Sequence, residues 1–147
     1  LPDTRVALLD HVGPPERLGD SIRRFIAWRR AHRLPPASSA TYNILYDDPD
    51  DTPPDQFRFG LAVATDRTIA ANDAGVVAGR IAGGRCALLR HVGSEATLGA
   101  AIRFLFAQWL PQSGAALRDA SPFLQRVTFF PEVPEHQAIT DIYLPLQ

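Results

Sequence analysis

The chain has 147 residues, of which 46% are hydrophobic and 21% charged, and its formal net charge is −1 at pH 7. This length fits one domain, or two small halves that share one core, and the near-neutral charge argues against direct binding to nucleic acid. The single cysteine excludes an internal disulfide, and the lack of a signal peptide or an apolar run of about 18 residues predicts a cytoplasmic protein without a membrane span.

The composition also predicts that this chain is one domain of a longer protein. All 15 basic residues are arginine, and the sequence contains neither lysine nor methionine. Because translation begins at methionine, we expect Leu1 to follow a removed segment.

The first half of the chain predicts a strand, a helix and two further strands. Residues 5–12 (RVALLDHV) are an apolar run that ends at Gly13-Pro14-Pro15, which is typical of a strand followed by a turn. Four apolar residues then recur at helical spacing: Leu18, Ile22, Phe25 and Ile26. Residues 41–46 (TYNILY) and 57–63 (FRFGLAV) are strand-like, and the acidic, proline-containing run between them predicts a loop.

The second half begins after an irregular link at 65–75. Residues 76–81 predict a short strand, and Gly83-Gly84 predicts a hairpin turn that joins it to a strand at 85–92. Ser94 fits the N-cap of a helix. The apolar stripe of that helix contains Leu98, Ile102, Leu105, Phe106 and Trp109.

The end of the chain completes the same order of elements. Pro111 and Gly114 are expected to close the second helix. Residues 122–130 (PFLQRVTFF) and 138–146 (AITDIYLPL) then predict a strand pair around the turn 131–134. Each half therefore predicts a β-α-β-β order.

The two halves also share sequence. Among the 24 positions 5–28, 12 are identical to the residue 80 positions later. We predict an α+β fold in which two duplicated β-α-β-β units, about 3–64 and 75–147, form one domain, 1–147, with pseudo-two-fold symmetry. Their strands would form one curved antiparallel sheet with the two main helices on one face. Because ligand pockets tend to occur between such units, we expect a cleft at the axis.

The titratable residues predict no metal, cofactor or catalytic centre. His11 and His91 occupy equivalent places in the two units, but no cysteine or carboxylate stands at ligand spacing, so we predict that they hold the strand-to-helix turns. The run DDPDD at 47–51 is too short for a calcium loop. The sequence has no Ser-His-Asp signature, phosphate-binding glycine loop or CxxC motif. Cys86 lies in an apolar run and predicts a buried thiol.

The two tryptophans differ in their place on the predicted helices. Trp109 lies in the middle of its apolar stripe and is predicted to be part of the core. Trp28 lies at the flank of its stripe, where an aromatic ring could line the edge of a cleft. Packing is the commoner role for either side chain.

Two amides stand in the predicted strands among apolar neighbours. Aligning Pro49 with Pro131 places Asn43 opposite Gln125 in the two units. A buried amide needs a partner, which can be backbone, water or ligand. An outward orientation is an equal alternative, because side chains alternate along a strand.

Five stretches resemble the GyrI-like small-molecule-binding domain, the effector-binding module of many AraC-family transcription regulators. They are RVALLDHVGPPERLG, YDDPDDTPPDQFRF, GGRCALLRHVG, WLPQSGAALRD and PEVPEHQAITDIYLPL, in order along almost the whole chain. The resemblance implies the pseudo-symmetric fold, an aromatic-lined pocket where the units meet, and multidrug binding of amphipathic or cationic molecules. With the amide of the first unit, the expected ligand-binding residues are Trp28, Tyr42, Asn43, Tyr46, Phe123, Gln125 and Tyr143.

Two positions depart from the family pattern. Gln125 stands where many relatives have a glutamate, and Gly60 stands where relatives often have an acidic residue. Because glutamine has no charge to pair with a cation, the departures favour a neutral or weakly polar ligand. They also argue against an enzyme, since the resemblance implies that related hydrolases of strained electrophiles depend on a pocket carboxylate.

We therefore predict the effector-binding domain of a bacterial transcription regulator, without catalysis. DNA contact would come only through a separate helix-turn-helix domain, and a homodimer is left open. One alternative is a stand-alone hydrolase or sequestering protein for toxic small molecules, with Asp141 as the nearest carboxylate. Two others are a gyrase-inhibitor-like protein and a haem-binding protein.

Overall fold

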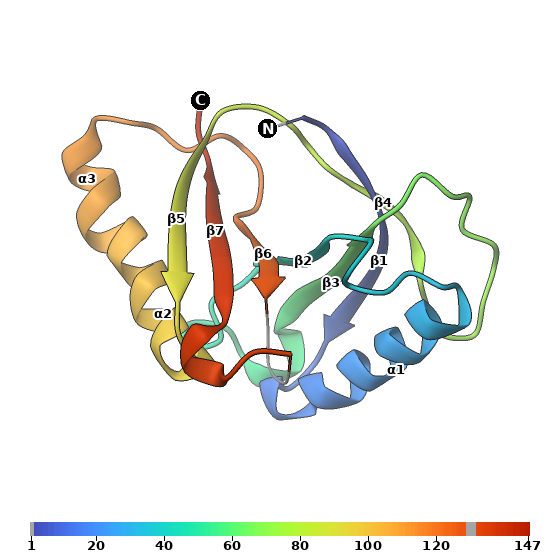
Figure 1. Ribbon diagram of the computed structural model, residues 1–147. Helices are drawn as coiled ribbons and strands as arrows, with labels where there is room; N and C mark the ends of the chain where they lie inside the picture. Colours follow the sequence, from blue (N-terminus) through green and yellow to red (C-terminus); the bar gives the residue numbers. More distant parts are fainter. Residues whose placement is uncertain (1, 129–131) are drawn as a thin grey trace.

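The fold is built on one sheet, as the computed structural model of residues 2–128 and 132–147 shows (Figure 1). In these residues seven antiparallel strands follow the order β4-β1-β3-β2-β6-β7-β5. The strands are β1 (Thr4–Val12), β2 (Thr41–Ile44), β3 (Arg58–Ala64), β4 (Val77–Ile81), β5 (Cys86–Val92), β6 (Phe123–Thr128) and β7 (Ile139–Pro145). The end of the predicted strand 122–130 and the first residue of the turn after it lie outside the described residues.

The helices follow the first strand of each half. A 3-10 turn, η1 (Pro15–Arg17), leads from β1 into α1 (Leu18–Ala31), and α2 (Glu95–Phe104) follows β5. Two further 3-10 turns, η2 (Pro54–Gln56) and η4 (Glu135–Gln137), precede β3 and β7. None of the described helices has the length and apolar character needed to cross a membrane.

The second helix changes its winding before it ends. α2 continues through a π-helical turn, η3 (Leu105–Trp109), into α3 (Leu110–Ser113). Pro111 explains the wider turn, because proline lacks an N–H and its ring would clash with the carbonyl four residues earlier in a regular helix. Gly114 then ends the helix in the left-handed conformation at φ 74°. The predicted end at Gly114 is confirmed, whereas Pro111, also expected to close the helix, lies within α3.

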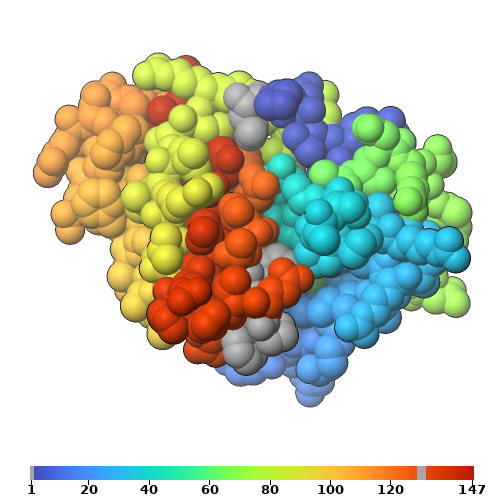
Figure 2. Space-filling view, viewed as in Figure 1, coloured from blue at the N-terminus to red at the C-terminus, as the bar shows by residue number. Residues whose placement is uncertain are grey.

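The two halves of the chain meet at the centre of the sheet. β2 pairs with β6, and β3 and β1 follow on one side as β7 and β5 follow on the other. Figure 2 shows the first half, blue to green, on one side of the molecule and the second half, yellow to red, on the other. The predicted α+β fold with one curved antiparallel sheet and two main helices is confirmed.

The predicted hairpin between 76–81 and 85–92 is wrong. β4 pairs with β1, from Thr4↔Ile81 to Leu8↔Val77, and β5 pairs with β7 at the far end of the sheet. The glycine pair at 83–84 therefore lies in a connection that crosses from one end of the sheet to the other. Ile81 is 5% exposed in a cluster with Val6, so burial against β1 favours this pairing over a local turn.

Side-chain alternation gives the sheet two distinct faces. On the face that we call the helix face, Leu9 and Leu61 pack with Phe25 of α1, and Leu124 packs with Leu98 of α2. Both helices are on this face, because Asn43 pairs in register with Leu61 and also with Leu124. The other face, which we call the opposite face, holds a third cluster that includes Val6, Tyr42, Ala62 and Phe123.

Candidate functional site

A cavity of about 1660 Å³ lies between α1 and α2, on the helix face of the sheet. Its floor is the central part of the sheet, which includes Asn43, Leu45, Leu61, Leu124 and Arg126. α1 packs on β1 and β3, and α2 packs on β6 and β7, so neither helix covers the centre of the sheet completely. The cavity exceeds the volume of about 300–1,000 Å³ that is usual for small-molecule sites.

The walls of the cavity are the apolar stripes of the two helices. α1 contributes Leu18, Ile22 and Ile26, α2 contributes Leu98 and Ile102, and η3 contributes Phe106. Three of these side chains stay partly exposed, at 37% for Ile22, 42% for Ile26 and 38% for Phe106. Contiguous apolar surface of this kind marks a place where a ligand or partner can bind, since covering it is favourable.

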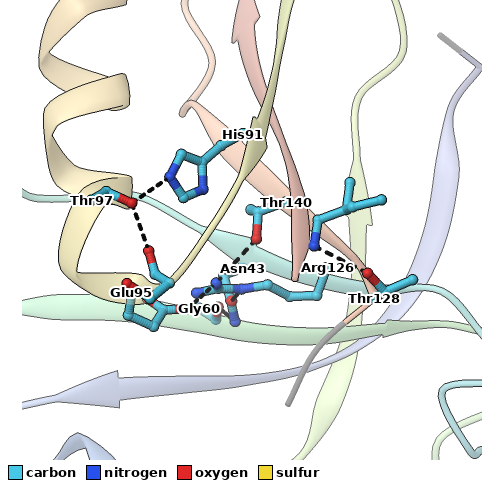
Figure 3. A network of polar contacts seen from close by, with 10 residues as sticks. Asn43, Gly60, His91, Glu95, Thr97, Arg126, Thr128 and Thr140 are labelled. Atoms are coloured by element: carbon cyan, nitrogen blue, oxygen red, sulfur yellow. Dashed lines mark hydrogen bonds and ion pairs between the residues drawn. The ribbon is translucent and has the colours of Figure 1, made fainter. Parts of the chain in front are cut away.

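A polar network crosses the floor and is centred on Arg126 (Figure 3). Its Nε donates to Oδ1 of Asn43 at 2.8 Å, and its Nη1 donates to Oγ1 of Thr140 at 3.4 Å. Nη1 also forms an ion pair with Glu95 in the first turn of α2. Asn43 in turn donates from Nδ2 to the carbonyl of Gly60 at 3.3 Å. The guanidinium is therefore held between two central strands and a helix.

Further charged groups surround the floor. Arg29 is 7% exposed, and this burial lowers the pKa of its guanidinium. The guanidinium donates hydrogen bonds to the carbonyls of Leu34 and Ser39 and to Oγ1 of Thr41, and it thereby connects the end of α1 to β2. The other arginines of the lining are Arg30, Arg33 and Arg103, and the carboxylates apart from Glu95 are Asp47, Asp48 and Asp50.

One of these carboxylates is fully engaged within the protein. Asp47 accepts two hydrogen bonds from the Arg58 guanidinium and one from the Arg58 backbone N–H. These hydrogen bonds lower the pKa of Asp47. Asp48 and Asp50 are exposed in the loop after β2, where Oδ1 of Asp48 accepts the Asp50 N–H.

Three of the seven predicted ligand-binding residues border the cavity: Tyr42, Asn43 and Tyr46. The side chains of Tyr42 and Tyr46 pack in the cluster of the opposite face, whereas the Asn43 side chain lies on the floor. Trp28 does not border the cavity, because its ring is 7% exposed and stacks between Phe25 and His32, with ring centroids 6.2 and 4.2 Å away. Trp28 is therefore a packing residue of α1.

Phe123, Gln125 and Tyr143 lie on the opposite face, away from the cavity lining. The rings of Phe123 and Tyr143 stack with centroids 4.8 Å apart, and Tyr42 meets Phe123 edge-on at 6.1 Å. The Tyr143 hydroxyl donates to Oε1 of Gln125 at 3.5 Å. The predicted aromatic residues thus gather as a packed cluster, with Tyr46 against it.

The predicted equivalence of Asn43 and Gln125 is wrong by one residue. Leu61 of β3 and Ile142 of β7 occupy equivalent places in the two units. Asn43 of β2 pairs with Leu61, and Leu124 of β6 pairs with Ile142, so Leu124 is the equivalent of Asn43. Gln125 is instead equivalent to Ile44, so the two amides point to different faces. The proline alignment failed because it matched the wrong prolines: Pro53 and Pro134, which precede η2 and η4, lie 81 positions apart, as Ile44 and Gln125 do, whereas Pro49 and Pro131 lie 82 apart.

Arg126 is the site residue that sequence reasoning missed. It follows Gln125 directly, and two adjacent polar residues in a strand must face opposite sides of the sheet. This pattern places one polar group on the helix face whichever way the strand is oriented. The signal was therefore present, but we assigned significance only to the amide.

The carboxylate considered for a hydrolase also lies on the opposite face. Asp141 is 4% exposed and accepts two hydrogen bonds from Arg90, at 2.8 and 3.0 Å. It is equivalent to Gly60, since Gln125 pairs with Asp141 as Ile44 pairs with Gly60. A Cβ at Gly60 would lie 2.9 Å from Cβ of Ile44, so the packing of β2 against β3 disfavours any side chain there.

The two equivalent histidines hold the strand-to-helix turns, as predicted. Nδ1 of His11 lies 2.8 Å from Oγ of Ser21, and its Nε2 lies 3.2 Å from the Gly13 carbonyl. Nε2 of His91 lies 2.8 Å from Oγ1 of Thr97 (Figure 3). Within the described residues, no group of three or more metal-ligating side chains is close enough to hold an ion. Cys86, predicted to be buried, is partly exposed.

Comparison with known families identifies the chain. The family model of the GyrI-like small molecule binding domain matches residues 1–147. The chain belongs to this family. It is also 38% identical to the probable transcriptional regulator YgiV of Escherichia coli K12, over 99% of this chain and 91% of that protein.

Solved structures agree with the GyrI-like fold. The C-terminal domain of EcmrR matches with a TM-score of 0.78 at 15% identity, over all of this chain and 93% of that one. In the EcmrR–DNA complex, this chain spans 55% of the EcmrR chain. SAV2435 bound to tetraphenylphosphonium matches with a TM-score of 0.63 at 10% identity, over all of this chain and 90% of that one.

Proposed function

We propose that this chain is the effector-binding domain of a transcription regulator and binds an amphipathic or aromatic small molecule in the cavity between α1 and α2. The observation that carries the proposal is the exposed apolar surface of Ile22, Ile26 and Phe106 around a cavity of about 1660 Å³. A ligand that fills this space would cover apolar area that the fold leaves in water.

The relatives support a role in regulation. YgiV is named a probable transcriptional regulator. EcmrR is seen in a complex with DNA, and this chain matches only part of the length of EcmrR. The net charge of −1 gives this chain no overall electrostatic attraction to the phosphates of DNA. We therefore propose that DNA contact belongs to a separate helix-turn-helix domain and that the regulator acts in the cytoplasm.

The relatives also support the ligand class. SAV2435 is seen with tetraphenylphosphonium, a large aromatic cation, so the likeness supports an aromatic ligand and says nothing in favour of a negative charge. We propose that Asn43 contacts the ligand, since its side chain lies on the cavity floor beside Arg126. The side chains of Tyr42 and Tyr46 pack in the cluster of the opposite face, so ligand contact by these two tyrosines belongs with the prediction for that face. Ligand contact by Phe123, Gln125 and Tyr143 on the opposite face stays a prediction. The experiment below distinguishes binding on the helix face from binding on the opposite face.

The test is a fluorescence titration with N-phenyl-1-naphthylamine, a neutral apolar probe. Ile26→Gln places an amide in the α1 wall and is expected to weaken binding about tenfold, because a polar group replaces apolar contact area. Leu88→Gln is the matched control, since Leu88 is 56% exposed and its register partner is Tyr143 on the opposite face. Loss of probe binding in Leu88→Gln, with Ile26→Gln unaffected, would place the site on the opposite face and overturn the proposal.

A further inference from the structure

The cavity floor contains a cation rather than a carboxylate. Arg126 projects from the central strand β6 into the floor, and 17% of its side chain is exposed. A charged side chain buried to this degree is retained only where partners compensate its lost hydration. The chemistry of those partners determines which ligands the floor can accept.

Two of the partners are neutral and fixed. Asn43 accepts from Nε at 2.8 Å and is itself 7% exposed and anchored to the Gly60 carbonyl, and Thr140 accepts from Nη1 at 3.4 Å. These contacts orient the guanidinium without neutralising its charge. Arg126 is therefore positioned in advance, whatever occupies the cavity.

The carboxylate that pairs with Arg126 among the described residues is Glu95, and it is held loosely. The Glu95 side chain is 74% exposed, so it can leave the guanidinium for water at little cost in hydration. The remaining carboxylates offer no replacement at the floor: Asp47 is bound to Arg58, and Asp48 and Asp50 are exposed in a loop.

We infer that the ligand is an amphipathic anion whose carboxylate or sulfonate replaces Glu95 on Arg126 while its apolar body lies between α1 and α2. This inference rests on the proposed function. An arginine fork binds such a planar or tetrahedral oxyanion through two N–H groups, and the apolar surroundings strengthen the contact. Five arginines line the cavity against four carboxylates, one of which, Asp47, is already bound to Arg58, so the charge of the lining favours an anion. An organic cation would find Arg126 at the floor without a carboxylate fixed in its reach.

The test compares two probes that share their rings and differ in one sulfonate. 8-Anilino-1-naphthalenesulfonate is the anion, and N-phenyl-1-naphthylamine is its neutral counterpart. In the wild-type chain, we expect the anion to bind at least about tenfold more tightly, as charge-assisted hydrogen bonds imply. Equal affinities, or tighter binding of the neutral probe, would overturn the inference.

Arg126→Gln is expected to remove this preference, so that the affinity for the anion falls to about that for the neutral probe. Arg80→Gln changes the net charge equally on β4, where the Arg80 side chain is 62% exposed and outside the cavity lining, and it should keep the preference. An equal loss for both probes in Arg126→Gln would mean that the arginine supports the shape of the floor only, which overturns the inference.

Glu95→Gln keeps the test decisive if Arg126→Gln fails to fold. Removing the competing carboxylate from an exposed side chain should tighten binding of the anion about threefold or more and leave the neutral probe unchanged. Unchanged or weaker binding of the anion in Glu95→Gln would contradict the inference that the ligand replaces Glu95 on Arg126. Failure of the proposed function has a different signature, since Ile26→Gln would then leave the neutral probe unaffected.

Discussion

The apolar side chains on the two faces of the sheet differ in how far they are exposed to solvent. On the helix face, Ile22 and Ile26 border a cavity and stay 37% and 42% exposed. On the opposite face, Phe123 is 2% exposed and stacks on Tyr143. Apolar surface that is already covered stabilises the fold, whereas uncovered surface is available to a ligand. The comparison teaches that aromatic residues in the central strands do not by themselves mark the binding side of this sheet.

The largest expected effect is on the packed face. Phe123→Ala should lower the free energy of unfolding by about 3–5 kcal/mol, because it leaves a void between Tyr42 and Tyr143. Urea unfolding followed by circular dichroism measures this. Phe104→Ala is the control, since Phe104 is 42% exposed on α2 and should cost far less. Similar losses for the two variants would mean that the opposite face is not the better packed one.

A smaller effect on stability is expected on the cavity side. Ile22→Ala should cost about 1 kcal/mol or less, because the side chain is partly exposed and little packing is lost. The same variant should weaken binding of the neutral probe, since it removes part of the wall. Stability from urea unfolding and affinity from fluorescence titration are then compared in one protein. A cost as large as that of Phe123→Ala would contradict the distinction between the faces.

The smallest effect concerns alkaline pH and involves all three tyrosines of the chain. Burial raises the pKa of Tyr42 and of Tyr143, and burial together with a hydrogen bond to Asp10 raises the pKa of Tyr46. Because these hydroxyls ionise more readily in the unfolded chain, stability is fully present below about pH 10 and falls as pH rises above it.

Tyr143→Phe tests this account of the alkaline loss. The variant removes one of the groups that ionise on unfolding, so its urea midpoint should decline less steeply between about pH 9 and 11 than that of the wild type. An identical decline in both proteins would show that Tyr143 does not contribute. Binding of the neutral probe to the folded protein should be the same for both over this range.

Local pattern predicted the elements well, and long-range pairing poorly. The apolar runs, the helical stripes and the helix end at Gly114 are set by neighbouring residues, so they could be predicted from the sequence. The partner of 77–81 is chosen by burial of Ile81 against Val6, which no local signal contains.

The site was predictable in place but not in composition. The repeat led us to expect a cleft at the centre, and Asn43 was identified. Which of two adjacent residues in β6 faces the helices depends on register, and an error of one residue moves a side chain to the other face. Because of that single shift, the prediction named the neutral amide of Gln125 where the structure places the guanidinium of Arg126 on the cavity floor.

The position of β4 means that the units of sequence and the units of folding have different boundaries. Residues 77–81 lie in the second half of the chain but complete the edge of the first half beside β1. A chain divided at the irregular link would therefore leave β1 with an open edge and the second fragment with an unpaired strand. The halves are expected to exchange hydrogen with solvent as one cooperative unit, despite their shared sequence.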